Sequence, residues 1–192
     1  MLNRLHKFAA GFHLRMLRRK FRPASFSLPD DLFNIKNVLV CLPPGQRQLT
    51  MIKDLLPELT RIFNESEIYL MASPGRSVYD IFPRKGYRIM TPSSNHVSWS
   101  GLATKNYINL LKENTYDLIL DLNLYPNRFA QSILLSFPEA IRIGNRNSLG
   151  VPHYNIEIKT RFVRDEKKIY RSIIETIDRL KNPAQSNNNI HV

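Results

Sequence analysis

The sequence predicts an α/β protein with a single Rossmann-like, doubly wound parallel sheet, preceded by a basic amphipathic helix. Two observations carry this prediction. Short continuous apolar runs, which are typical of strands buried on both faces, alternate along the chain with longer segments of helical periodicity. The clearest example is the apolar run at 116–123, which ends in polar residues and is followed by a helical segment and a second apolar run at 140–143. Strands that alternate with helices favour a parallel sheet with crossover helices.

Residues 1–22 predict a basic amphipathic helix. Leu5, Ala9 and Met16 fall with two phenylalanines on one stripe at helical spacing, and most basic residues lie elsewhere around the axis. Such a helix either lies on an anionic membrane surface or packs against its own domain or a partner, which is the commoner use of an apolar stripe. The predicted membrane or partner surface comprises Arg4, Lys7, Phe8, Phe12, Arg15, Arg18 and Arg19.

The rest of the chain divides into three segments. Residues 23–35, with Pro23, Pro29 and two adjacent aspartates, predict a linker. Residues 36–182 predict the Rossmann-like α/β domain, and the polar residues 183–192 predict a disordered tail.

The domain is predicted to begin with a strand over 37–42 and a helix over 48–63. Pro57 in this helix predicts a kink or a break, because proline has no N–H group to donate. The polar stretch 91–100 predicts a loop. The other predicted elements are strands at 67–71, 87–90, 117–122, 140–143 and 153–158, and helices at 78–82, 102–112, 128–137 and 164–180.

The charge balance indicates a polyanionic neighbour. The formal net charge is +12, and residues 1–22 contribute seven basic residues and no acidic one, which leaves +5 for the rest. A nucleic acid or an anionic lipid surface would fit this balance, although solubility alone explains it equally well. Nucleic acid is disfavoured, because the chain lacks a basic sheet face interleaved with aromatic residues and a helix-turn-helix pattern.

Composition also bears on compartment and cofactors. Cys41 is the only cysteine, so an intrachain disulfide is excluded and a reducing compartment is favoured. No apolar run approaches the ~20 residues that span a bilayer, and the N-terminus lacks the apolar core of a secretory signal. We therefore predict a cytoplasmic protein, peripheral at the inner membrane if its first helix binds lipid. The five histidines lack metal-ligand spacing, and we predict neither a metal nor a cofactor.

Candidate site residues follow from the place where open α/β sheets bind ligands, the carboxyl ends of the strands. Asp121, Asn123 and Arg128 follow or end the strand at 117–122 and are predicted to face a ligand there. Asp117 lies four residues before Asp121, so both side chains project from the same strand face. The two carboxylates either form a like-charge pair that raises one pKa or hydrogen-bond the backbone of neighbouring loops.

Two loops offer further candidates. Gly45, Gln46 and Arg47 follow the first strand in a turn with two prolines, and the loss of two N–H donors disfavours dinucleotide binding. Gln46 can still hydrogen-bond a sugar, and Arg47 can bind a phosphate. Trp99, in the polar loop, either stacks on a sugar or anchors the loop.

Several of these segments together carry a family resemblance. They are the opening strand with its glycine turn at 38–45, the segment 116–122, Arg128 in the following helix, Arg142-Ile143-Gly144, and the late helix that contains Tyr170. In order and spacing, the chain from about Lys36 to Lys181 resembles the N-terminal half of the glycosyltransferase family 9 enzymes, the heptosyltransferases that build the inner core of lipopolysaccharide.

The resemblance implies one half of a GT-B enzyme, in which two Rossmann-like domains face each other. The half in this chain would bind the acceptor, and the half that grips the nucleotide sugar would be missing after the final helix. The family's first turn carries an aspartate that is thought to act as base; Gln46 stands there, and an amide cannot accept a proton at neutral pH. We therefore expect acceptor binding without catalysis by this chain alone, and a separate donor-domain chain as partner.

Two other classes of function stay open. The chain is a non-catalytic scaffold that kept the fold, with a protein partner across the exposed crevice or along the helix at 164–180. Alternatively it is a nucleic-acid-associated protein that uses residues 1–22, whose binding would weaken steeply as salt rises.

Overall fold

A six-stranded sheet in which all strands are parallel forms the centre of the computed structural model, and its strand order is β3-β2-β1-β4-β5-β6. The structure describes residues 2–22, 24–27, 29–83, 85–149 and 152–182, and only the backbone of residues 2–9. The strands are β1 (Asn37–Cys41), β2 (Glu67–Met71), β3 (Arg88–Met90), β4 (Leu118–Asp121), β5 (Ile141–Asn145) and β6 (Ile156–Ile158). This order, which reverses between β1 and β4, confirms the predicted Rossmann-like fold.

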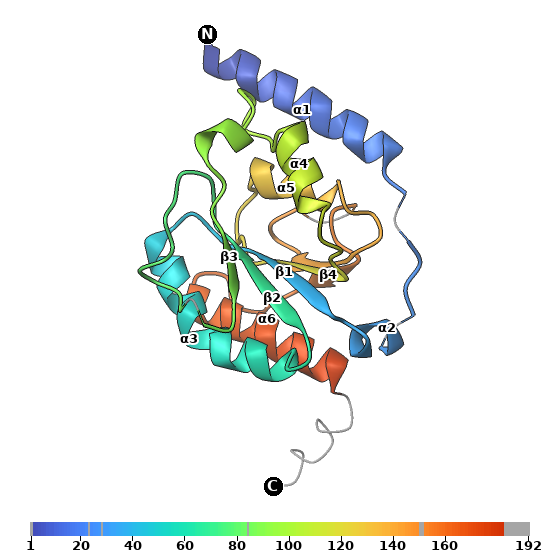
Figure 1. Ribbon diagram of the computed structural model, residues 1–192, viewed down its shortest axis with the longest axis vertical. Helices are drawn as coiled ribbons and strands as arrows, with labels where there is room; N and C mark the ends of the chain where they lie inside the picture. Colours follow the sequence, from blue (N-terminus) through green and yellow to red (C-terminus); the bar gives the residue numbers. More distant parts are fainter. Residues whose placement is uncertain (1, 23, 28, 84, 150–151, 183–192) are drawn as a thin grey trace, which may run out of the picture.

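Helices cover both faces of the sheet. They are α1 (Leu2–Lys20), α2 (Asp30–Phe33), α3 (Gln46–Ile62), α4 (Lys105–Leu111), α5 (Arg128–Leu134) and α6 (Glu166–Lys181), with a 3-10 turn at Ser94–His96. Figure 1 shows α3 and α6 side by side under one face, α4 and α5 on the other, and α1 crossing outside α4 and α5. The sheet is therefore the middle layer of a sandwich, with α1 as an additional outer element.

Two hydrophobic cores lie on opposite faces of the sheet because successive strand side chains point to opposite sides. Val38 and Val40 of β1 belong to the core beneath α3 and α6, whereas Leu39 and Cys41 belong to the core beneath α4 and α5. A strand buried on both faces needs apolar residues at every position, which is why the continuous apolar runs predicted these strands.

Two predicted details of the helices are wrong. The segment at 78–82 is a single turn closed by Ile81 N and Phe82 N on the carbonyl of Val78, and Pro83 prevents its continuation. Of the kink or break predicted at Pro57, the break does not occur, since α3 runs unbroken to Ile62. Pro57 lies on the solvent side of α3, and the buried leucines on the opposite side hold the helix against the sheet.

The segment at 23–35 is only partly a linker. It contains α2, and Leu32 and Ile35 are buried in the core beneath α3 and α6. The prediction missed them because two apolar residues among prolines and aspartates form no periodic pattern. The residues predicted as a disordered tail, 183–192, lie outside the described residues.

The first helix packs on its own domain, but through a different stripe from the predicted one. Ala10, Leu14 and Phe21 are buried, whereas Phe12 and Met16 are 59% and 43% exposed. Leu14 and Phe21 contact Leu102 and Leu135, which precede α4 and end α5. The side chains of three other residues predicted at this surface, Arg4, Lys7 and Phe8, lie outside the described ones.

A buried arginine joins the end of α1 to the sheet. Arg142 on β5 is 1% exposed, and its guanidinium donates to the carbonyls of Phe137, Ala140 and His153 at 3.0, 3.2 and 2.9 Å. The ring of Phe21 covers the guanidinium with 4.4 Å between its centroid and Cζ. Burial lowers the pKa of Arg142 to about 10. The arginine therefore ties two loops and the α1 end together.

Gly144, two residues later on β5, makes room for an aromatic ring. A Cβ atom at this position would lie 2.3 Å from Cε1 and Cζ of Tyr154. The ring crosses β5 here, and its hydroxyl donates to Oδ2 of Asp121 at 2.7 Å. Any side chain at 144 would push Tyr154 away from this carboxylate.

We predict that Gly144→Ala destabilises the fold by about 1–3 kcal/mol, because the new methyl group overpacks the Tyr154 ring. Gly11→Ala in α1 is the matched control, since nothing lies within 4 Å of its added Cβ. Alanine is the better helix former, so this variant should gain up to about 1 kcal/mol. Urea denaturation of both variants measures the difference; equal stabilities would contradict the packing argument.

Candidate functional site: a crevice at the carboxyl edge of the sheet

The sheet edge where a ligand is expected carries two neighbouring cavities. The first has a volume of about 410 Å³ and lies between the loops that follow β1 and β4, the two strands at which the strand order reverses. The second, of about 750 Å³, lies between Arg47 and the segment before α6. Leu124 and Tyr125 line both cavities. We call the two cavities together the crevice.

The structure brings part of the predicted site together at this crevice. Asn123 and Arg128 line the first cavity, and Arg47 lines the second. Gly45 and Gln46, which cap and begin α3, line neither of the two. The candidate residues after β1 and after β4 therefore reach the same edge, but only three of them line the crevice.

Asp121, the most prominent candidate from sequence, is buried and hydrogen-bonded inside the protein. Its Oδ1 accepts from the backbone N of Asn123 at 3.0 Å and from Nδ2 of the same residue at 2.7 Å, and its Oδ2 accepts from Tyr154. Oδ1 of Asn123 accepts from Nδ2 of Asn127 at 3.1 Å, and Oδ1 of Asn127 accepts from the N of Ala130 at 3.3 Å. This Asp121 chain of hydrogen bonds fixes the loop between β4 and α5.

The two strand aspartates do not form a like-charge pair. Oδ2 of Asp117 accepts from the backbone N of Lys36 and Asn37 at 2.8 and 2.9 Å, at the amino end of the sheet. Burial raises the pKa of Asp121, and the hydrogen bonds from Asn123 and Tyr154 oppose that rise. Of the two predicted alternatives, a like-charge pair or hydrogen bonds to the backbone of neighbouring loops, the second is correct for both Asp117 and Asp121.

The sequence missed several residues that line the crevice. Tyr125 is 68% exposed between the two cavities, and Asn145, at the carboxyl end of β5, lines the second. The rule that placed Asp121 at a strand end would also have found Asn145, but the predicted strand ended two residues too early. Gln48 lines the first cavity and donates to Oε1 of Glu166 at 2.9 Å, joining the starts of α3 and α6.

Unpaired positive charge is the main chemical property of the crevice. Among the described residues, no carboxylate lies within ion-pair distance of Arg47, Arg128 or Arg164, all of which line it. Glu166 is the one acidic side chain among the lining residues of the two cavities, and Gln48 already donates to it. Guanidinium groups without a carboxylate partner suit a phosphate or carboxylate ligand.

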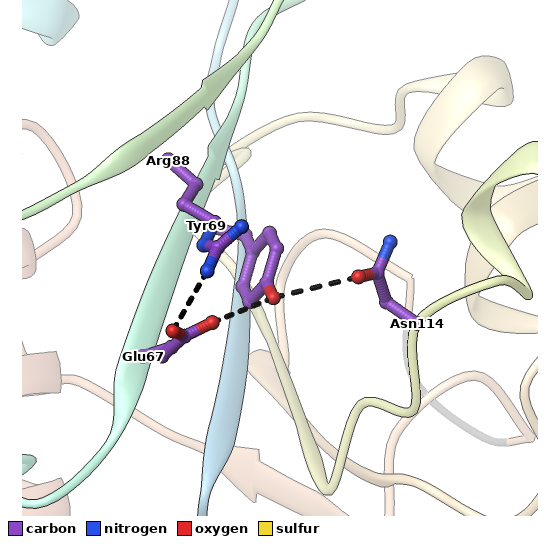
Figure 2. A network of polar contacts seen from close by, with 4 residues as sticks. All are labelled: Glu67, Tyr69, Arg88 and Asn114. Atoms are coloured by element: carbon purple, nitrogen blue, oxygen red, sulfur yellow. Dashed lines mark hydrogen bonds and ion pairs between the residues drawn. The ribbon is translucent and has the colours of Figure 1, made fainter.

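A second polar cluster lies at the amino edge of the sheet, away from the crevice. Figure 2 shows Glu67 between the guanidinium of Arg88, at 2.8 Å, and the hydroxyl of Tyr69, at 2.8 Å, with Asn114 on the far side of that hydroxyl. The hydrogen bond from Arg88 is the largest cause that lowers the pKa of Glu67. These groups satisfy one another on an exposed surface, so the cluster joins β2 to β3 rather than offering a site.

Three further features of the described residues concern a thiol, metal ligands and membrane spans. The Cys41 thiol is buried, and burial raises its pKa well above the usual value, so it stays protonated. Within the described part of the chain, no three His, Cys, Asp or Glu side chains are grouped as metal ligands would be. None of the described helices has the length and apolar character needed to cross a bilayer.

Comparison with solved structures shows the same fold in a glycosyltransferase. The structure of heptosyltransferase WaaC from E. coli with ADP matches with a TM-score of 0.53 and 14% identity, over 73% of this chain and 46% of that one. The structure of the same enzyme with ADP-2-deoxy-2-fluoro heptose gives a TM-score of 0.45 at 11% identity, over 73% and 47% of the two chains. This chain thus spans about half the length of these enzymes.

The likeness is one of fold. No family model matches the sequence, and no curated protein matches it either. The Rossmann-like α/β fold expected from the sequence is therefore shown, and it is similar to part of a GT-B glycosyltransferase.

The raised pKa of Asp121 predicts a pH dependence of stability. Because the folded-state pKa lies above the ordinary value of 3.8, the contribution of this group is fully present below that value and is lost as pH rises through the folded-state pKa. Asp121→Asn keeps the shape and removes the titration. We expect the wild-type free energy of unfolding, minus that of the variant, to fall as pH rises from about 4 and then to level off.

Urea denaturation at a series of pH values measures this difference. Asp54→Asn, which changes an exposed aspartate on α3, is measured in parallel as the matched control for the substitution. A difference that rises with pH at Asp121 would mean that its ionised form stabilises the fold.

Proposed function

We propose that this chain is the acceptor-binding half of a heptosyltransferase-like enzyme of glycosyltransferase family 9, in the assembly of lipopolysaccharide or a related envelope glycan. The observation that carries the proposal is the crevice, which presents arginines without an ion-pair partner among the described residues at the strand-order reversal of a sheet whose fold is similar to part of a heptosyltransferase. Ligands of open α/β sheets bind at this place.

The crevice residues favour a phosphorylated sugar as the ligand. Arg47, Arg128 and Arg164 can each donate two parallel hydrogen bonds to a phosphate. The exposed ring of Tyr125 offers an apolar face between the two cavities for a sugar ring. Asn123 and Asn127 each use one amide N–H within the Asp121 chain, which holds them in the wall, and each amide group has a second N–H to donate.

The same residues argue against catalysis by this chain alone. A base for the acceptor hydroxyl must reach its proton and accept it at neutral pH. Gln46 cannot accept a proton, and Asp121 is buried in its own hydrogen bonds. We propose that a donor-binding domain on a separate chain supplies the remaining groups, and that it contacts the exposed Tyr125 and Val163 at the crevice.

The proposed compartment is the cytoplasm. Cys41 is a free, buried thiol, and a lone protected cysteine is compatible with a reducing environment.

A scaffold without any sugar ligand is the second candidate, and one observation favours it. Val163 is 82% exposed at the mouth of the second cavity, close to the exposed Tyr125, and such apolar surface suits a protein partner. The other surface considered for this reading, α6, has its apolar face in the core: Ile169, Ile173 and Ile177 are buried against the sheet and α3.

Titration calorimetry with a deacylated, phosphorylated core oligosaccharide tests the proposal, with ADP- and UDP-linked sugars in parallel. We expect binding of the phosphorylated oligosaccharide and a loss of about tenfold or more in affinity for Arg47→Ala and for Arg128→Ala, since each removes a charge-assisted hydrogen bond. Arg171→Ala, an exposed arginine of α6 outside the crevice, is the matched control and should bind like wild type.

Three outcomes separate the candidates. Binding of the oligosaccharide that is lost in the crevice variants supports the acceptor-side function. Absence of binding to every sugar, together with a stable protein partner that Tyr125→Ala releases, supports the scaffold. Equal losses in Arg128→Ala and Arg171→Ala would mean that the charge of the whole protein, and not the crevice, attracts the ligand.

A further inference from the structure

A large apolar groove lies between α1 and the rest of the domain. Its volume is about 660 Å³, and its walls come from α1, from the loop at 98–104, and from α4 and α5. Most of the lining surface is apolar, with Phe12, Leu17, Trp99, Leu102 and Ile108 in the walls, and small polar side chains such as Ser98 and Ser132 lie between them. We call this cavity the α1 groove. Only the docking of α1 onto the domain creates it, because residues far apart in the chain form its two sides.

Large apolar side chains remain exposed at the α1 groove. Trp99 is 64% exposed and Phe12 is 59% exposed, and both line the groove, while Met16 follows one turn after Phe12 on α1. A single exposed apolar residue is common on protein surfaces and needs no explanation. Several exposed aromatic residues around one apolar cavity instead indicate an interaction site. The apolar lining of the groove therefore extends to the exposed surface of the protein.

The charge around the α1 groove specifies an anionic partner. Residues 1–22 contain no acidic residue, and Arg15, Arg19 and Lys20 are exposed on α1 without an ion-pair partner among the described residues. Lys105, at the start of α4, adds a cation to the lining of the groove. Arg18 instead lies with Nη2 3.3 Å from Nε2 of His153, so it helps to hold α1 on the domain.

We propose that α1 and Trp99 form a docking surface for a membrane rich in anionic phospholipid, with the α1 groove accepting an acyl chain. Helices that lie in a membrane interface combine exposed Phe, Trp or Leu side chains with Arg and Lys residues that contact lipid phosphates. Tryptophan suits this depth because its ring is apolar while its N–H can still meet water. An acidic protein surface would pair with the arginines and lysines, but it would supply no apolar group comparable to an acyl chain to fill the α1 groove.

The proposal differs from the surface predicted from sequence in its residues. Phe12, Arg15 and Arg19 stay on the docking surface, Arg18 turns to the domain, and Trp99 joins from a loop more than 80 positions away. The proposal is also independent of the sugar ligand, because neither Phe12 nor Trp99 lines the crevice.

The single tryptophan of the chain makes the test direct. The full chain is mixed with vesicles of phosphatidylcholine alone or of phosphatidylcholine with phosphatidylglycerol, and co-sedimentation and tryptophan emission are measured. We expect sedimentation and a blue shift of the emission with the anionic vesicles only. Lipids brominated on their acyl chains should quench the emission, since Trp99 would lie among those chains.

Two variants and two controls locate the surface. Phe12→Ser should raise the lipid concentration needed for half-binding about tenfold or more, because it removes a large apolar side chain that would insert into the membrane. Arg15→Gln combined with Arg19→Gln should weaken binding to anionic vesicles in a salt-dependent way. Phe33→Ser on α2, a phenylalanine 49% exposed away from the groove, and Arg171→Gln on α6 should bind like wild type.

Several results would overturn the proposal. Unchanged tryptophan emission with anionic vesicles would place Trp99 outside any membrane, and equal losses in Phe12→Ser and Phe33→Ser would remove the groove from the interaction. Emission that shifts with protein concentration in the absence of lipid would assign the surface to a second copy of the chain. Binding to RNA or DNA that competes with vesicles and leaves Trp99 unquenched would assign the cations to nucleic acid. Phe12→Ser should keep oligosaccharide binding in each case, so failure here is distinct from failure of the proposed function.

Discussion

The carboxylate of Asp121, buried at the end of β4, is the interaction on which the crevice depends. Moving an ionised carboxylate out of water is costly unless donors replace the water, and here Asn123 supplies two and Tyr154 one. The first partner fixes the loop that leads into α5, and the second fixes the segment that precedes β6. Residues of these two loops line parts of both cavities, so part of the shape of the crevice follows from the buried Asp121 side chain.

Arg142 plays the corresponding part for α1. Its buried guanidinium has no carboxylate partner among the residues that the structure describes; it donates instead to loop carbonyls, and Phe21 covers it. The residue that follows α1 is thereby part of the domain core. Gly144 admits the Tyr154 ring, so Arg142 and Gly144 both serve packing. The segment Arg142-Ile143-Gly144, which suggested an enzyme family, thus specifies a fold, in agreement with a structural likeness at 14% identity.

The protein keeps two cationic surfaces with different apolar neighbours. In the crevice, Arg47, Arg128 and Arg164 surround one exposed tyrosine, an arrangement suited to a small anionic ligand with a polar body. Around the α1 groove, arginines accompany Phe12 and Trp99 beside a cavity with a mostly apolar surface, an arrangement suited to lipid. Both surfaces contribute to the net charge of +12, so the net charge could not by itself distinguish one kind of partner from another.

The sequence by itself determined the strands, the longer helices and the Rossmann-like sheet, because burial on both faces leaves a continuous apolar run that is local in the chain. It also placed Asn123, Arg128 and Arg47 at the correct edge. Only the tertiary structure decided that Asp121 is an internal anchor, that α1 buries Leu14 instead of Phe12, and that Trp99 lies beside α1. These outcomes depend on partners more than 30 positions away, such as Tyr154 and Leu102. A local sequence pattern carries no information about which distant residue will hydrogen-bond a polar side chain or pack against an apolar one.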